Sequence, residues 1–511
     1  MEQSVATTKE NKFGKFFKNI WTNLVSELHT GDNEFFTLLA ECAIVAGILF
    51  LSLIWKYFVF LAVFVSALFI IKYRSAKSVY FMVFLLPFLN IIRLYSGQLY
   101  FSIYLWCLTL LILGIKLLID FIKKEKKINW FFTIMCVVLA VYFILPFGPI
   151  NFTNHGAIYL SLAIVFVMYY YGKDLSFKQI VLVFAFGAFI ASFFGFFRPC
   201  FKHAKEIIPE FPDVLQRFTG VSNDPNYYSG DMLLILACTL VLYATKKINY
   251  LAYPLILLAS VFCFKSLSKM MIIIYAILMT TFCIYWLIRN RNKKGFLQVC
   301  GITTCFLLSA LICFAQFASI FKRLNRDDEF VKDSSQVESG LINKDESSAA
   351  GETEYVEYKF RNNRFTVLTT GRTNIWLSYF DASTDSVVHI LFGNGIGADY
   401  IYCDNGYKTA YFSEHNTFVQ MFYRLGIVGC LLVVATIIST CKKEYVKKFK
   451  FYNLMPFIIL FGLFMALCNL LSYRISIYIT IIALSLVPVE EEKACDLESK
   501  EENLGVKTVN E

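Results

Sequence analysis

Long apolar runs separated by short polar connections fill most of the chain between residues 35 and 489. A helix that crosses a bilayer needs about 20 mostly apolar residues, and backbone hydrogen bonding in lipid restricts spanning segments to helices or closed barrels. Strand-like alternation is absent, so the pattern predicts helices. About 12–14 spans are expected, at roughly 35–54, 57–71, 79–94, 100–121, 129–147, 157–171, 179–197, 228–245, 249–264, 270–288, 296–317, 416–440, 453–470 and 473–489.

The basic residues predict an orientation for these spans. With the N-terminus inside, every inside loop carries Lys or Arg, as the positive-inside rule requires. The largest opposite loop, 318–415, holds 10 Lys/Arg against 15 Asp/Glu. The expected organisation is a cytoplasmic segment 1–34, transmembrane helices over 35–317, an extracytoplasmic loop 318–415, transmembrane helices over 416–489 and an acidic cytoplasmic tail 490–511.

Composition agrees with a membrane protein. Residues are 57% hydrophobic and only 17% charged, too few for the surface of a soluble protein of this length. The net charge of +10 could suggest nucleic acid, but the basic residues lie in short clusters between apolar runs, so no nucleic-acid partner is expected. Most of the 15 cysteines lie inside apolar segments. Cys200 and Cys403 fall in two outside loops, where a disulfide between them is left open.

Charged residues at the outer membrane edge are the candidates for chemistry, because burial of charge there is costly. Each has a simpler interpretation: Arg and Lys often extend into the headgroups, and Asp-Pro-Asn often begins a helix. Together, however, cations on one face can hold a diphosphate, and a histidine can take a proton from a hydroxyl. The central parts of the spans are nearly free of charge. The candidates are Arg198, Arg217, Asp224, Asn226, Lys269, Arg372, Glu414 and His415.

Three stretches resemble the bacterial O-antigen ligase and repeat-unit polymerase (Wzy-type) superfamily. The first is Arg217–Gly220 with Asp224–Asn226, which matches an Arg-x-x-Gly and Asp-Pro-Asn element. The second is Ser266–Lys269, with Lys269 where the family usually has Arg; the charge is kept without the planar fork. The third runs from Gly371–Arg372 through the turn Gly393–Gly397 to His415–Asn416, followed by the glycines of 422–429.

The resemblance implies an all-α polytopic membrane protein of GT-C-like fold, with one large, partly helical outer loop. It also implies metal-independent glycosyl transfer from a glycan on undecaprenyl diphosphate. Arg217, Lys269 and Arg372, with Arg198 at a span end, would contact the diphosphate, and His415 would activate the acceptor hydroxyl. Asp224 and Asn226 would order the loop or the acceptor, and Glu414 would tune His415. No outer-face Asp-x-Asp or histidine cluster demands a divalent ion, so no cofactor is expected.

The expected function is therefore polymerisation of oligosaccharide repeat units into capsule, exopolysaccharide or O-antigen, on the outer face of a bacterial plasma membrane. Expected partners are the lipid-linked oligosaccharides and the bilayer, with a chain-length regulator and a flippase as candidates. Two alternatives stay open. One is a ligase that moves glycan to a lipid, protein or wall acceptor. The other is a polysaccharide transporter or flippase, which would place charges at mid-membrane.

Overall fold

The structure is a computed structural model. It describes residues 18–28, 33–55, 57–73, 75–88, 101–144, 149–197, 200–201, 218–222, 224–314, 371–404, 409–440 and 451–467, with Lys15 and Ile481. Its helices are α2 (Asn33–Ser52), α3 (Phe58–Lys72), α4 (Ser75–Leu85), α6 (Phe101–Ile122), α7 (Trp130–Ile144), α8 (Phe152–Tyr171), α9 (Phe177–Phe196), α11 (Pro225–Ala244), α12 (Ala252–Lys265), α13 (Lys269–Arg289), α14 (Lys293–Ile312), α17 (Arg372–Thr384), α18 (Val387–Phe392), α19 (Thr417–Thr440) and α21 (Leu454–Ala466), with short 3-10 turns η1 (Leu86–Phe88), η3 (Gly172–Asp174) and η6 (Phe451–Asn453).

These helices confirm the expected all-α polytopic membrane protein. Six of those described (α2, α9, α11, α13, α14 and α19) are long and apolar enough to cross a membrane. Each expected span from 35–54 to 453–470 coincides with a described helix, and 473–489 lies outside the described residues apart from Ile481. Large apolar side chains such as Leu118, Phe131 and Leu311 point outward and are more than half exposed, as expected where lipid replaces water.

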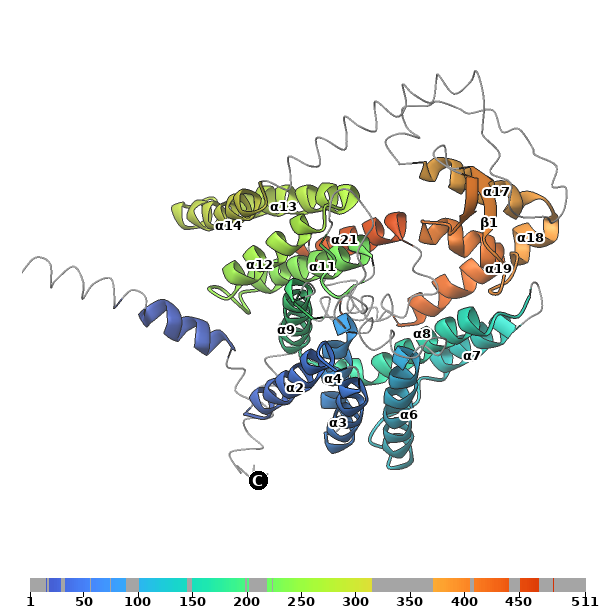
Figure 1. The fold of residues 1–511 in the computed structure, drawn as a ribbon, viewed down its shortest axis with the longest axis horizontal. Coiled ribbons are helices and arrows are strands. Elements are labelled where there is room, and N and C mark those ends of the chain that lie inside the picture. The colour runs from blue at the N-terminus through green and yellow to red at the C-terminus, as the bar shows by residue number, and fades with distance from the viewer. Residues whose placement is uncertain are drawn as a thin grey trace, which may run out of the picture.

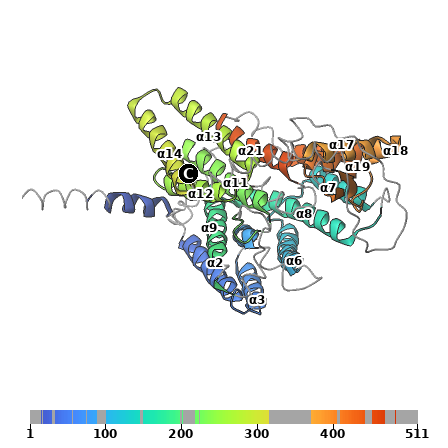
Figure 2. The same cartoon turned by 45° about the horizontal axis from the view of Figure 1, so that its top comes forward.

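Helix α11 lies at the centre of the larger helix group (Figure 1). Within its most apolar stretch, 94% of the residues are buried, because α9, α12, α13 and α21 all pack against it. A second group holds α7, α8 and α17–α19, on the other side of both views (Figures 1 and 2). Helix α21 contacts α11 and α13 of the first group and α19 of the second, so it connects the two.

The outer segment 371–415 is partly helical, as expected. Its helices are α17 and α18. An antiparallel hairpin, which the sequence pattern did not predict, follows them. Its strands are β1 (Ile401–Asp404) and β2 (Thr409–Phe412), with Ile401 opposite Phe412 and Tyr402 opposite Tyr411.

A short helix over residues 18–28 is held against the start of α12 by one carboxylate. Glu27 accepts hydrogen bonds from the backbone nitrogens of Asn249, Tyr250 and Leu251 at 3.0, 2.9 and 2.8 Å. These three amides lie in the turn just before α12, where the positive end of the helix dipole favours a carboxylate. The N-terminal segment is therefore tied to a turn more than 200 residues later in the chain.

Candidate active site

His415 occupies an unusual position two residues before α19. Its φ is +48°, a left-handed conformation that side chains with a β-carbon seldom adopt and that often marks functional sites. The ring is largely enclosed, and Ser413 Oγ lies 3.3 Å from Nε2. Burial, together with the positive charge of Arg372, lowers the pKa of His415 to about 4, although Asp224 acts in the opposite direction. The imidazole is therefore neutral at pH 7 and can accept a proton.

The structure brings three of the predicted site residues together. Arg372 is the first residue of α17, directly after Gly371 with its left-handed φ of +76°. Asp224 precedes α11, and both side chains act electrostatically on His415. These three residues come from parts of the chain separated by about 150 and 40 residues. A shared substrate requires these three residues to lie near one another, and their electrostatic effect on His415 agrees with that.

Asn226 and the Ser266–Lys269 stretch also lie side by side. Asp224 Oδ1 accepts from the backbone nitrogens of Asn226 and Tyr227 at 2.6 and 3.3 Å, which caps α11. The side chain of Asn226 points toward α13, because its Oδ1 accepts a 2.6 Å hydrogen bond from Ser268 Oγ. Ser268 is the residue before α13, so two motifs that are distant in sequence are joined at the starts of their helices.

Four helices therefore begin at the candidate site. Asp224, Ser268, Gly371 and Asn416 directly precede α11, α13, α17 and α19. The starts of α11 and α13 are joined by the hydrogen bond between Ser268 and Asn226, and α17 packs on α19. The amides at two of these starts are already capped, those of α11 by Asp224 and those of α19 by Asn416 Oδ1, which accepts from the backbone nitrogens of Phe418 and Val419. The helix dipoles still give these ends a positive potential, which together with Arg372 makes this region suited to an anion.

Three predicted cations cannot be placed by their side chains. Arg198 and Arg217 lie outside the described residues, and only the backbone of Lys269 is described. Phe218, the residue after Arg217, is held near the site because its backbone nitrogen donates to Lys265 O at 3.1 Å. Lys265 ends α12, four residues before Lys269. The expected roles of these three residues stay predictions.

A buried ion pair next to His415 was missed in the sequence. Arg424 Nε lies 2.8 Å from Glu414 Oε1, and neither side chain has exposed surface. Arg424 Nη1 also donates to the carbonyls of Ile396 and Ala398 at 2.7 and 2.9 Å, and Gln420 donates to Glu414 Oε2. These contacts give Glu414 a structural role, and the expected tuning of the imidazole by Glu414 stays a prediction.

The Gly393–Gly397 turn packs against a break in α19. Gly426 has φ +61° and ψ −170° inside this helix, which frees the carbonyls before it. Asn394 N donates to Tyr423 O at 2.7 Å, and Gly395 N donates to Arg424 O at 3.1 Å. A side chain on Gly393 would meet the Arg424 backbone at 2.5 Å. The turn therefore packs closely against the break in α19. Its sequence alone is that of a generic turn and does not predict this contact.

Comparison with known proteins places this geometry in context. Residues 254–434 match the model of a family described as O-antigen ligase. This match confirms the resemblance to the O-antigen ligase superfamily. No curated protein and no solved structure matches the chain. The match supports an O-antigen ligase- or polymerase-type function in general, and with it a glycosyltransferase-like enzyme in a multi-pass membrane protein.

The O-antigen ligase match covers one part of the site and not the other. It includes Lys269, Arg372, the Arg424–Glu414 pair and His415. Arg198, Arg217, Asp224 and Asn226 lie before it. Asp224 nevertheless acts electrostatically on His415, so the structure extends the site of the O-antigen ligase region to α11, beyond the residues that the family model matches.

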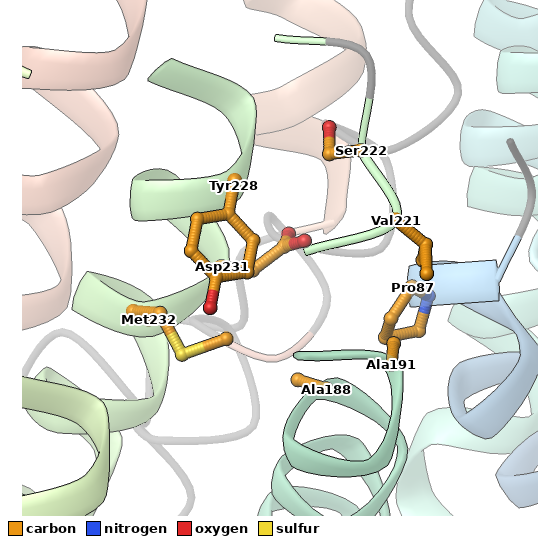
Figure 3. Close-up of a pocket in the computed structure, with 8 residues that line it drawn as sticks. All are labelled: Pro87, Ala188, Ala191, Val221, Ser222, Tyr228, Asp231 and Met232. Carbon is orange, nitrogen blue, oxygen red and sulfur yellow. The ribbon is translucent and has the colours of Figure 1, made fainter. Parts of the chain in front are cut away.

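A small pocket lies between α9, α11 and the loop that leads into α11 (Figure 3). Asp231 on its wall is 3% exposed and stands seven residues after Asp224, two turns along one helix face. The expectation of nearly charge-free spans therefore has an exception, and an acidic group inside a span usually has a function. The lining residues are Pro87, Ala188, Ala191, Val221, Ser222, Tyr228, Asp231 and Met232.

The two loop cysteines are not joined. Cys200 is exposed and Cys403 is buried, and neither is part of a disulfide. Cys403 packs with Ile375, Tyr379 and Tyr423 beneath the hairpin, so it behaves as a small apolar core residue. The pairing left open in the sequence is therefore absent from the structure.

Proposed function

We propose that this protein joins oligosaccharide repeat units carried on undecaprenyl diphosphate into a surface polysaccharide. The observation that carries the proposal is a neutral, largely enclosed His415 that lies within the electrostatic influence of both Arg372 and Asp224, just before a helix inside the O-antigen ligase match. A neutral imidazole is the form that accepts a proton, and the arginine beside it suits a phosphate group.

The proposed reaction uses these residues in separate roles. Arg372, with Lys269, Arg217 and Arg198, holds the diphosphate of the donor, and the helix N-termini add further positive potential. His415 takes the proton from the attacking hydroxyl of the acceptor. The new glycosidic bond forms at the anomeric carbon as the bond to the diphosphate breaks, and the diphosphate departs with the electron pair. Cations in place of a metal ion stabilise the departing charge.

The buried pair Arg424–Glu414 is proposed to hold His415 in place. Glu414 is adjacent to His415, and the pair links it to α19 and, through Ile396 and Ala398, to the segment that follows α18. Fixed supporting residues are needed because a displacement of about 1 Å at a catalytic group can cost a hundredfold in rate. This role explains an ion pair that a membrane protein could otherwise replace by apolar residues.

The test is chain elongation in vitro. Purified protein mixed with a short lipid-linked oligosaccharide should produce a ladder of longer lipid-linked products. His415→Ala should abolish the ladder, and His389→Ala should leave it intact. His389 is a matched control because it lies in the same outer segment but pairs with Asp385. A ladder of normal length from His415→Ala would remove His415 from the mechanism.

A ligase is the second candidate, since the matched family is described as O-antigen ligase. A ligase would make no ladder from one lipid-linked oligosaccharide alone, and it would form product only when a lipid, protein or wall acceptor is added. Transport is a third candidate. It predicts movement of lipid-linked glycan across proteoliposome membranes that does not depend on His415.

Both termini are proposed to be cytoplasmic, with the site on the extracytoplasmic side of a bacterial plasma membrane. The support is the distribution of Lys and Arg between the loops. Asp345→Cys, within the loop 318–415 and in a chain that also carries Cys200→Ala, should react with an impermeant thiol reagent added to intact cells. Protection of that cysteine would reverse the orientation.

A further inference from the structure

The hairpin presents a pair of exposed tyrosine rings close to His415. Alternation along β1 turns Cys403 inward, to the small core beneath the hairpin, and turns Tyr402 outward. Tyr402 faces Tyr411 across the strands, with ring centroids 5.0 Å apart and an interplanar angle of 63°. Their exposed fractions are 59% and 70%. The two rings are therefore not needed to fill the core beneath the hairpin.

The frame that carries the two rings is fixed. The hydroxyl of Tyr379, a fully buried residue of α17, donates to Phe412 O at 2.6 Å and accepts from Ile401 N at 3.1 Å. One side chain thus holds both strands at the open end of the hairpin, where β1 contacts α17 (Figure 1). Rings on an anchored frame lose little conformational freedom when a ligand binds.

The rings are also close to the proposed general base along the chain. Strand β2 runs directly into Ser413, Glu414 and His415. His415 is the fourth residue after Tyr411, so their α-carbons are at most about 14 Å apart. A glycan whose hydroxyl lies at His415 can therefore reach the tyrosine pair with its neighbouring sugar rings.

Charge in the segment 371–415 argues against a phospholipid surface as the occupant. Its only basic residues of the Lys and Arg type are Arg372 and Lys408, against five acidic residues, Asp381, Asp385, Asp399, Asp404 and Glu414. Anionic headgroups attract clusters of basic residues and are repelled by acidic ones. An uncharged sugar chain meets no such penalty, and the C–H face of a pyranose ring suits the negative face of an aromatic ring.

We propose that Tyr402 and Tyr411 form a carbohydrate-binding platform that holds sugar rings of the acceptor glycan beside His415. The inference rests on the proposed glycosyl transfer, but it applies equally to a polymerase and to a ligase, because either can use a glycan acceptor. The platform binds and orients the acceptor and takes no part in proton transfer.

Kinetics test this role separately from the chemistry. The double variant Tyr402→Ala with Tyr411→Ala should raise the KM for the acceptor at least tenfold and change kcat at saturating acceptor by less than about threefold. Phenylalanine at both positions should keep a KM near that of the wild-type protein, since the ring faces remain. Tyr57→Ala is the matched control, because Tyr57 is 52% exposed but lies between α2 and α3.

Binding without turnover separates this proposal from the proposed function. In nanodiscs, His415→Ala protein should transfer NMR saturation to a free repeat-unit oligosaccharide, and adding the two alanines should remove the signal. An elongating wild-type protein with an unchanged KM in the double alanine variant would overturn the platform alone. Saturation transfer that survives the two alanines would do the same. If the wild-type protein did not elongate the oligosaccharide at all, the proposed function would be overturned instead.

A photo-crosslinker identifies the alternative occupant. With p-benzoylphenylalanine in place of Tyr411, irradiation in the presence of the oligosaccharide should give a glycan adduct. A phospholipid adduct in its place would assign the tyrosines to the membrane interface and overturn the platform.

Discussion

Replacement of Arg424 by methionine should destabilise the protein strongly. The guanidinium has no exposed surface and binds Glu414 and two backbone carbonyls at 2.7–2.9 Å. Methionine fills much of the volume but leaves the Glu414 carboxylate buried without its counter-charge. Loss of one partner of a buried ion pair costs on the order of 3–5 kcal/mol, and each buried carbonyl left without a donor adds to this. We expect Arg424→Met to lower the free energy of unfolding by about 4 kcal/mol or more.

The assay is SDS titration in mixed micelles, followed by circular dichroism, on three variants. Arg424→Met and Glu414→Gln are measured singly and then combined. The combined variant should be more stable than the sum of the single losses predicts, because no unpaired charge is left buried. The control Arg289→Met removes an exposed arginine at the end of α13 and should cost no more than about 1 kcal/mol. Strict additivity of the two single losses would refute the pair as the source of the stability.

Three further predictions follow from the same geometry. For elongation, kcat/KM should stay at its full value down to about pH 5 and fall only near pH 4, because His415 in the substrate-free protein stays neutral until the pH reaches its lowered pKa. Asp224→Asn should move this fall to lower pH, since the carboxylate raises the pKa, and an acidic limb near pH 6.5 in the wild-type protein would contradict the assigned base. Arg372→Lys should lower kcat/KM at least tenfold, because a point charge replaces a planar fork; wild-type kinetics would show that Arg372 does not bind phosphate in this way. Gly393→Ala should reduce the yield of folded protein, because its new methyl group meets the Arg424 backbone, whereas the lipid-side Gly114→Ala has open space and should be harmless.

Much of the helical fold was predictable because the bilayer imposes a length on each apolar run. The expected span 179–197 and the observed α9, at Phe177–Phe196, differ by no more than two residues at either end. The hairpin was not predictable in the same way. Each strand has four residues, and alternation over so few residues is not distinguishable from an irregular loop. Its stability comes from Tyr379, which only the tertiary structure places beside it.

Site residues that stand in short sequence motifs were predictable, whereas those that depend on tertiary packing were not. His415, Arg372 and Asp224 stand in local patterns, and the structure brings them together. Arg424 stands in an apolar run with no local partner except Glu414, ten residues earlier. Because Glu414 precedes α19 and Arg424 lies within it, the ten-residue spacing does not follow the periodicity of a helix. Its partners Ile396 and Ala398 are more than 25 residues away, so a contact of this kind leaves no signature in one sequence.

The clasp between Glu27 and the start of α12 has a practical consequence for anyone who purifies this protein. Three backbone amides depend on an acceptor that the ribosome makes about 220 residues before them. Trimming the chain past Glu27 would leave the turn before α12 without this acceptor, and α12 is the helix with which the family match begins. A shortened form of the protein should therefore keep Glu27.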